Sequence, residues 1–315
     1  MPRTILVTAA SGHIGQQLLP LLQPLEATRV ILPTSNGARL SASLPAATES
    51  SAASFIVEEG SVKDPSWFQG LLTKYEVDTV FLCLTGEDEL FTTMNCFDCL
   101  SRTKSVKHLI YLSACADFAS PEAAQSILQT CSAGHVLVKI LTEQKLMYGN
   151  LPFTWTVIRP ALFFINDLRT KKSLLERGVY NEPLGEKGVS RVAPSDIALA
   201  VKNIFVDGSG KWVGKHVPIG SRRAYKGSEI AKIWSNALGK EVDIYPADEA
   251  GLERFEQELG ARSNAAWGRD MRLMVETLAE RGFGMTEEEY RLQVELLGKV
   301  PEDYEAWVKE IASSW

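Results

Sequence analysis

The sequence has no apolar run long enough to span a bilayer and no excess of positive charge. It contains 33 Lys and Arg against 39 Asp and Glu, a formal net charge of −6. A spanning helix needs about 20 apolar residues, and nucleic-acid binders cluster positive charge. We therefore expect no membrane or nucleic-acid partner. Residues 1–3 lead directly into the first apolar run and leave no room for a signal peptide, so we expect a cytoplasmic protein.

Cysteines are few, and their spacing gives no metal signature. Cys96 and Cys99 form the only C-x-x-C pair among the five cysteines, and they lie within a helical pattern. A zinc site of this type needs a second pair at suitable spacing, which is missing. We expect buried, reduced thiols and no bound metal.

Apolar runs alternate with helical patterns through the first half of the chain. The predicted strands are residues 5–7, 29–32, 55–57, 77–84, 108–113 and 154–160. The predicted helices include residues 66–74, 87–103 and 135–148, whereas 34–54 reads as a loop with at most a short helix. Continuous apolar strands joined by helical crossovers favour a parallel sheet covered on both faces. We predict an α/β fold with a doubly wound, mostly parallel Rossmann sheet.

The first strand leads into a segment of small residues, Thr8–Gly15, which opens a helix. Small residues let the backbone approach a pyrophosphate, and the N–H groups that begin the helix attract its charge. Rossmann spacing would place a glycine at position 9. The chain has Ala9 there, which disfavours positive φ, so we expect an ordinary turn. The motif predicts a dinucleotide cofactor; a tight turn without a ligand is the alternative.

The pattern changes after Pro160, where an aromatic and apolar stretch is followed by helices that become acidic from Ser228 onward. We predict a dinucleotide-binding Rossmann domain of residues 1–160 with about 192–222. Residues 161–191 and 223–315 are predicted to form a smaller, mainly helical lobe that binds substrate and covers the cofactor.

Short motifs follow one another in a fixed order along nearly the whole chain. They are Thr8–Gly15, Gly60–Pro65, Val106–Ser113, Lys139 with Glu143, Leu151–Thr154, Arg159-Pro160, Pro194–Ala198 and Leu297–Pro301. This ordered set resembles the NmrA-like family, an atypical branch of the short-chain dehydrogenase/reductase superfamily. The chain departs from the family at Ala9, which replaces the first glycine, and at Ser61, which replaces an acid.

The resemblance implies NADP(H) as the cofactor, with NAD(H) the less favoured alternative. No acid ends the second strand, where NAD binders hold the ribose 2′-OH, and Arg39 or Arg29 could meet a 2′-phosphate. The predicted cofactor contacts lie in the glycine turn, after the second and fourth strands, and on the helix of residues 135–148. They are Thr8, Ala10, Ser11, Gly12, His13, Ile14, Thr34, Ser35, Arg39, Leu84, Thr85 and Lys139.

Lys139 is the first catalytic candidate. Ordinary superfamily members use Tyr-x-x-x-Lys, but here His135 stands in the tyrosine position, one turn before Lys139 on the same helix face. The resemblance to isoflavone-reductase-like enzymes implies that the lysine acts as an acid–base or polarising group. His135 titrates in a range suited to general-acid work. The alternatives are a Lys139 that pairs with Glu143 and only holds the ribose, and a His135 that only packs.

Further candidates follow the fifth and sixth predicted strands. Ser113 and Tyr111 share one strand face, and the resemblance implies a carbonyl-polarising serine near Ser113. A hydroxyl satisfied within the protein is the alternative. Phe163, Phe164 and Asn166 are predicted to line the substrate pocket, because ligands bind beyond the carboxyl ends of parallel strands. Core packing is the alternative for both aromatic residues.

Three functions remain open from the sequence. The first is an NADP(H)-dependent oxidoreductase acting on a small organic substrate, such as an aromatic, quinone or enone metabolite. The second is a non-catalytic NADP(H) sensor that binds a partner protein, as some NmrA-like proteins do. The third is a cofactor-assisted isomerase or cyclase without net redox chemistry. The missing tyrosine and Ala9 favour the sensor, whereas Lys139 and the aromatic stretch favour the enzyme.

Overall fold

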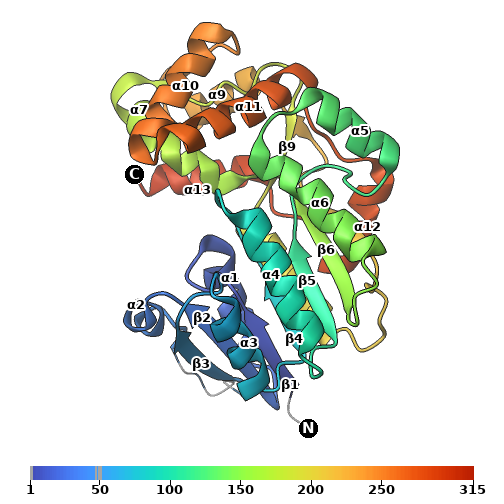
Figure 1. The fold of residues 1–315 in the computed structure, drawn as a ribbon. Helices are drawn as coiled ribbons and strands as arrows, with labels where there is room; N and C mark the ends of the chain where they lie inside the picture. The colour runs from blue at the N-terminus through green and yellow to red at the C-terminus, as the bar shows by residue number, and fades with distance from the viewer. Residues whose placement is uncertain (1–2, 47, 49–51) are drawn as a thin grey trace. The chain divides into compact units, whose positions relative to one another are not determined.

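The computed structural model describes residues 3–46, 48 and 52–315 (Figure 1). Residues 1–2, and 47 and 49–51 of the predicted loop, lie outside the described residues. The chain divides into two compact units. Unit 1 comprises Met1–Ser113, Leu141–Arg159 and Pro194–Val217, and unit 2 comprises Ala114–Ile140, Pro160–Ala193 and Pro218–Trp315.

The division differs from the predicted domains in the segment Ala114–Ile140, which groups with unit 2 rather than with the Rossmann domain. The physical reason is a separate apolar cluster. Phe118, Ala124 and Ile140 are buried against one another, with Ile127 and Leu137 packed on them. The segment therefore buries its apolar side chains locally.

The central sheet has seven strands in the order β10-β6-β5-β4-β1-β2-β3. Its strands are β1 (Arg3–Val7), β2 (Thr28–Thr34), β3 (Ser54–Glu59), β4 (Thr79–Leu82), β5 (His108–Leu112), β6 (Thr154–Pro160) and β10 (His216–Ile219). Every neighbouring pair from β3 across to β6 runs parallel. The strand interiors are apolar on both faces, as in Ile5, Leu6 and Val7, which are fully buried. The predicted doubly wound Rossmann sheet is confirmed.

Helices cover both faces of this sheet. The helices of unit 1 are α1 (His13–Leu22), α2 (Gly37–Ala42), α3 (Pro65–Lys74), α4 (Glu89–Arg102) and α8 (Pro194–Val206), together with the end of α6 (Gly134–Tyr148). Right-handed crossovers place α1 and α2 on one face and α3 and α4 on the other. Accordingly, α1 packs against α8, and α3 packs against α4. The chain reverses its direction of travel between β1 and β4, where doubly wound folds bind ligands.

Unit 2 contains two small sheets and most of the helices of the second half. Its strands are β7 (Leu162–Phe163), β8 (Val179–Tyr180), β9 (Val189–Val192), β11 (Ala224–Tyr225) and β12 (Asp243–Ile244). Its helices are α5 (Pro121–Thr130), η1 (Phe164–Thr170), α7 (Lys171–Arg177), α9 (Gly227–Leu238), α10 (Glu249–Arg262), α11 (Ala265–Arg281), α12 (Glu287–Leu297) and α13 (Tyr304–Ser313). An aromatic core built around Phe164, Tyr180, Trp234 and Tyr304 holds these elements together.

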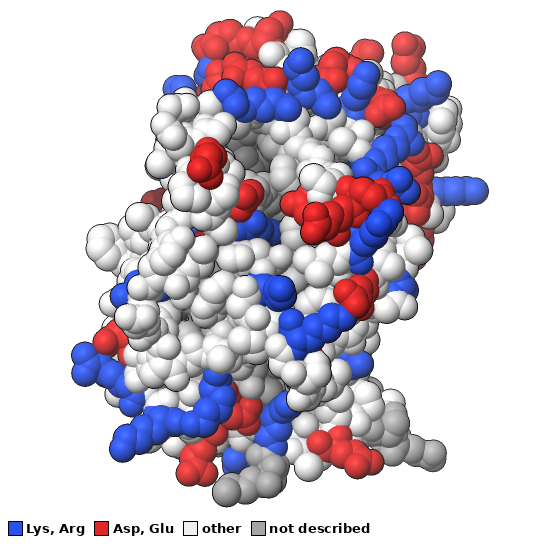
Figure 2. Space-filling model, turned by 90° about the vertical axis from the view of Figure 1, so that its right-hand side faces the viewer, with Lys and Arg blue, Asp and Glu red and all other residues white. Residues whose placement is uncertain are grey.

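Charges of both signs lie next to one another on the surface shown in Figure 2. Exposed ion pairs also occur, such as Lys63 with Asp88 at 2.8 Å. The described residues of this face therefore form no continuous basic stripe. Within the described ranges, every helix is too short or too polar to cross a bilayer.

Candidate functional site

The glycine turn lies between β1 and α1, at the carboxyl end of the central strands, where the strand order reverses. Gly12 is the N-cap residue of α1 and supplies no side chain to the first turn of this helix. A Cβ at Gly15 would lie 2.3 Å from the backbone oxygen of Ala10, and one at Gly12 would lie 3.1 Å from that of Ala9. Both glycines therefore permit a close approach that a side chain would block. The geometry fits the pyrophosphate of a dinucleotide on the N–H groups of α1.

The expectation of an ordinary turn at Ala9 is wrong. Ala9 has φ of 53°, in the left-handed region that favours glycine. The turn is closed by the Gly12 N–H, which donates to the Ala9 oxygen at 2.9 Å. The chain therefore keeps the backbone shape of a glycine turn at this position despite the Cβ.

Replacing Ala9 by glycine is expected to stabilise the protein by about 0.5–1 kcal/mol. Relief of the left-handed strain is worth about 1–2 kcal/mol, and the added flexibility of the unfolded chain removes about 0.5–1 kcal/mol of it. Urea unfolding measures the change. Ala10→Gly is the matched control: Ala10 is buried and outside the positive-φ set, so this change is expected to destabilise. Equal losses from both variants would contradict the strain at Ala9.

The end of β4 is held against the glycine turn by Thr8. The Thr8 hydroxyl donates to the Phe81 oxygen at 3.1 Å and accepts from the Cys83 N–H at 2.8 Å. Thr8 is buried, so its side chain positions the two strand ends within the protein. Leu84 is half-buried and packs on the core of unit 1, while Thr85 is exposed beyond it. Ser11 and His13 are exposed on the turn, and Ala10 and Ile14 are buried beneath it.

The segment after β2 begins α2 and carries the residues predicted to meet a 2′-phosphate. The side chain of Asn36 caps α2 by accepting from the Arg39 N–H at 2.8 Å. Ser35 and Arg39 are exposed, and Thr34 is half-buried. Sequence reasoning missed Glu59 at the end of β3, which accepts from the Gly37 N–H at 2.7 Å. The parallel pairing of β2 with β3 places Glu59 opposite Thr34. Aligning the ends of these two predicted strands could therefore have identified Glu59.

Ser113 is tied into a buried charged cluster of unit 1. Its hydroxyl donates to Oε1 of Glu143 at 2.5 Å, and Arg159 Nη2 lies 2.5 Å from Oε2 of the same carboxylate. His216 Nε2 lies 3.2 Å from Glu143 Oε2. Burial raises the pKa of Glu143, but hydrogen bonds from His216, Arg159 and Ser113 outweigh it and lower the pKa below its usual value. Because a serine has one hydroxyl proton, the Ser113 proton is committed to Glu143 in this arrangement.

Tyr111 is fully buried on the preceding part of β5. Its hydroxyl donates to Glu89 Oε1 at 3.3 Å, and its ring packs edge-on against Phe97, with centroids 6.3 Å apart. Glu89 and Phe97 both belong to α4. These contacts make Tyr111 part of the packing between the sheet and α4.

The pair Cys96 and Cys99 also lies on α4, inside the same core. Burial raises the pKa of Cys96 to about 12, which keeps its thiol protonated at neutral pH. Of the five cysteines predicted to be buried, Cys96, Cys99 and Cys131 are buried, whereas Cys83 and Cys115 are half-buried. In the described part of the chain, no cluster of three metal-binding side chains occurs.

His135 and Lys139 lie one turn apart near the start of α6, both within unit 2. Lys139 is 5% exposed, which is unusual for a lysine and requires a compensating environment. The Nδ1 atom of His135 contacts Oδ2 of Asp270, a residue of α11 that sequence reasoning missed. Asp270 lies 135 positions along the chain from His135, so no local pattern indicates the pairing.

The three residues predicted to line the substrate pocket differ in exposure. Phe163 and Asn166 are partly exposed, whereas Phe164 is fully buried between Tyr304 and Trp307, with ring centroids 5.2 and 5.6 Å away. The packing alternative therefore describes Phe164 in this conformation. Phe163 and Asn166 retain surface for a ligand.

A fully buried carboxylate, Asp167, connects five elements of unit 2. It accepts hydrogen bonds from Tyr180 at 2.8 Å and from the Trp234 ring nitrogen at 3.0 Å, and it also pairs with Tyr304 and Arg191. Arg191 is itself fully buried, and its guanidinium lies over the Tyr304 ring. Each charge is thus compensated by the other and by neutral donors. Sequence reasoning missed this cluster, because its members are scattered along the chain.

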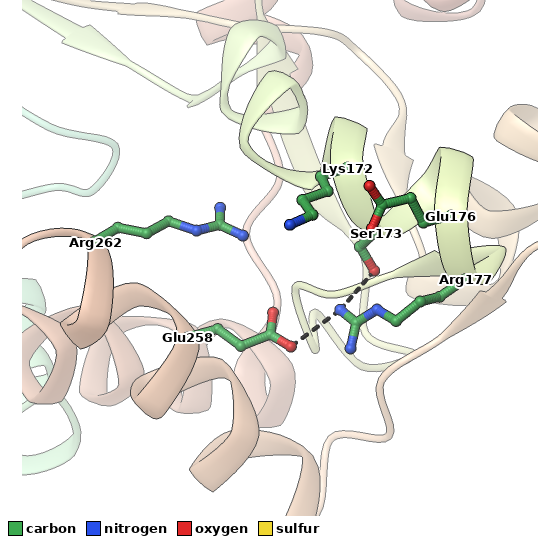
Figure 3. Close-up of a pocket in the computed structure, with 6 residues that line it drawn as sticks. All are labelled: Lys172, Ser173, Glu176, Arg177, Glu258 and Arg262. Atoms are coloured by element: carbon green, nitrogen blue, oxygen red, sulfur yellow. Dashed lines mark hydrogen bonds and ion pairs between the residues drawn. The ribbon is translucent and has the colours of Figure 1, made fainter.

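Unit 2 also has an open cavity of about 300 Å³ (Figure 3). It is lined by Lys172, Ser173, Glu176, Arg177, Glu258 and Arg262. Arg177 donates to Glu258 at 3.0 Å and to Ser173 at 2.8 Å, so these three lining residues bond to one another. None of the predicted site residues lines this cavity.

The sheet topology and the glycine turn define a Rossmann-type α/β protein. Residues 1–267 match the sequence model of the NmrA-like family. The chain belongs to the NmrA-like family.

Characterised relatives include both enzymes and a regulator. The chain is 26% identical to the NAD(P)H azoreductase of Xenophilus azovorans over 239 residues, 76% of this chain and 75% of that protein. The fold matches the NADPH-dependent quinone oxidoreductase QOR2 of Escherichia coli complexed with NADPH, with a TM-score of 0.76 and 18% identity, over 98% of this chain and 99% of that one. It also matches NmrA, a negative transcriptional regulator in complex with NADP, with a TM-score of 0.72 and 15% identity, over 100% and 97% of the two chains.

Proposed function

We propose that this protein is an NADP(H)-dependent reductase of a small organic acceptor of the quinone, enone or azo class. The observation that carries the proposal is the glycine turn, where Gly12 and Gly15 let the backbone at the start of α1 pack closely against Ala9 and Ala10, as in a dinucleotide-binding turn. Support for reduction comes from membership of the NmrA-like family and from the similarity to an NAD(P)H azoreductase.

In this proposal the cofactor is held by residues of the glycine turn after β1 and by residues that follow β2. The N–H groups at His13 and Ile14 bind the pyrophosphate, while Ser35 and Arg39, exposed after β2, bind the 2′-phosphate. NAD(H) is less favoured, because no acid ends β2 and Glu59 is already bonded to the Gly37 N–H. When bound, NADPH supplies a hydride to the acceptor.

Lys139 has a double role in the proposed reaction. Lys139 and His135 lie one turn apart on α6, so in this proposal both belong to the same part of the site. We assign Lys139 to the cofactor ribose and to stabilising negative charge that develops on the acceptor. Ser113 is assigned a supporting role through Glu143, because its hydroxyl proton is already donated to that carboxylate.

The test is NADPH consumption by the purified protein across a panel of quinones, enones and azo dyes. Replacing Lys139 by methionine is expected to lower kcat about 100-fold while NADPH still binds, because charge stabilisation and proton transfer act in the transition state. Lys145→Met is the matched control: Lys145 is an exposed lysine of the same helix, and its loss is expected to leave kcat unchanged. A Lys139→Met enzyme with full turnover would contradict the assigned role.

A second candidate function is an NADP(H)-sensing regulator that binds a partner protein. It is favoured by the structural similarity to NmrA and by His135 in the position of the usual tyrosine. Binding of NADPH without turnover of any acceptor, together with a partner whose binding depends on NADP(H) redox state, would favour this function. Conversion of a substrate without net NADPH consumption would indicate an isomerase or cyclase.

A further inference from the structure

Asp270 of α11 meets the first turn of α6 with both of its carboxylate oxygens. Oδ1 accepts from the Gly134 N–H at 2.5 Å, and Oδ2 contacts Nδ1 of His135. The ring of Trp267, one turn earlier on α11, lies 5.4 Å from the imidazole ring at an angle of 48°. The imidazole is therefore held by a carboxylate at one nitrogen and by an indole against its ring.

The neighbouring cations do not compete for this carboxylate. Arg269 is bonded to Glu256 on α10 at 2.9 Å, and Arg272 is bonded to Glu249 at 2.7 Å and approaches Glu256 at 3.4 Å. Burial raises the pKa of Asp270, but the hydrogen bond and charge of His135 and the backbone N–H groups outweigh it and lower the pKa below its usual value. Asp270 is thus an anion at neutral pH.

A carboxylate at Nδ1 fixes the chemistry of the other nitrogen. The neutral imidazole keeps its proton on Nδ1, and protonation then occurs at Nε2 next to a compensating negative charge. The side chain of His135 is 17% exposed, so a solvent-accessible path to the ring remains. This arrangement orients the ring and leaves Nε2 as the nitrogen that gains and loses a proton.

We propose that His135 is the proton donor of the reduction and that Asp270 is its positioning residue. This proposal rests on the proposed reductase function and adds a residue of α11 to it. A hydride adds to the acceptor and leaves an electron pair on its oxygen or nitrogen. The Nε2–H bond of the imidazolium breaks, its proton goes to that electron pair, and the acceptor is reduced by two electrons. His135 is left neutral with Nδ1–H bonded to Asp270, and solvent returns a proton to Nε2.

The discriminating variant is Asp270→Asn. The amide oxygen can still accept from the Gly134 N–H and keep the start of α6 in place. The amide nitrogen, however, donates to Nδ1 and forces the neutral imidazole to carry its proton on Nε2. We therefore expect the fold to be retained while the tautomer of His135 changes.

The first readout is independent of turnover. Nitrogen-15 NMR of the four histidines, assigned with His135→Gln, is expected to show the Nδ1–H form of His135 in the unmodified protein and the Nε2–H form in Asp270→Asn. An unchanged tautomer in Asp270→Asn would overturn the positioning role.

The second readout is the steady-state kinetics of the reductase. We expect His135→Gln to lower kcat about 100-fold with little change in KM, the scale of general acid catalysis. Asp270→Asn is expected to lower kcat as well, with little change in KM, because it favours the wrong tautomer of His135. Asp248→Asn is the matched control, because Asp248 accepts from the Gly251 N–H at 2.9 Å at the start of α10 and is expected to change neither readout.

The outcomes separate this proposal from the reductase function on which it rests. Full activity of His135→Gln, with NADPH still consumed, would overturn the proposal and leave the reductase function intact. If the unmodified protein binds no NADPH and reduces no acceptor, both fail together. Loss of kcat in His135→Gln with normal NADPH binding, together with the tautomer change in Asp270→Asn, supports both.

Discussion

Replacing Gly15 by alanine is expected to abolish tight NADPH binding and to destabilise the protein by about 1–3 kcal/mol. The new Cβ would lie 2.3 Å from the Ala10 oxygen and 2.5 Å from the Cα and carbonyl carbon of Ala10, which cannot rotate away as a side chain could. The start of α1 must therefore shift from the end of β1. That shift removes the N–H groups from the position proposed for the pyrophosphate.

The matched control is Gly70→Ala on α3, also a glycine inside a helix of unit 1. Nothing lies within 4 Å of the Cβ that this change adds. Alanine is the better helix former by about 0.8–1 kcal/mol, so Gly70→Ala is expected to stabilise the protein and to leave NADPH binding unchanged. Calorimetric titration and urea unfolding of both variants provide the comparison. A folded Gly15→Ala protein with unchanged NADPH affinity would show that the glycine turn is not the cofactor site.

Replacing Asp167 by alanine is expected to destabilise unit 2 by about 3–5 kcal/mol, because it leaves the buried Arg191 charge without its counter-ion. The change also removes the acceptor of Tyr180, Trp234 and Tyr304, which come from β8, α9 and α13. Loss of near-ultraviolet circular dichroism from these aromatic residues should accompany the lower unfolding midpoint.

The control for Asp167 is an exposed aspartate of the same unit. Asp243 lies exposed on β12, and Asp243→Asn is expected to change stability by less than about 0.5 kcal/mol. A similar small effect of Asp167→Ala would contradict the view that the charged cluster stabilises the core of unit 2.

The sequence predicted the Rossmann sheet well, because its strands are continuous apolar runs. The strands beginning near Ile5, Phe55 and His108 were found within a few residues of their observed bounds. The helix α5 was not predicted, although its apolar residues recur at helical spacing as clearly as those of α3 and α4. Ser120 followed by Pro121 is a helix start signal, and Ser120 does cap α5 by accepting from the Ala123 N–H at 3.2 Å.

The parts of the site that sequence could not predict all depend on long-range pairing. Asp167 and Tyr304 are 137 positions apart, and Asp270 reaches His135 across 135 positions. In the sequence, the residues on either side of each aspartate do not distinguish it from a surface aspartate. Ala9 illustrates a different limit: residue type predicted an ordinary turn, but the strand-to-helix connection imposed the left-handed conformation.

Isothermal titration of the unmodified protein with NADPH, and in parallel with NADH, measures whether the turn holds a dinucleotide. We expect saturable one-to-one binding of NADPH that is tighter than that of NADH. The absence of any heat of binding with either nucleotide, from protein shown to be folded, would contradict the assignment of the glycine turn and the reductase function built on it.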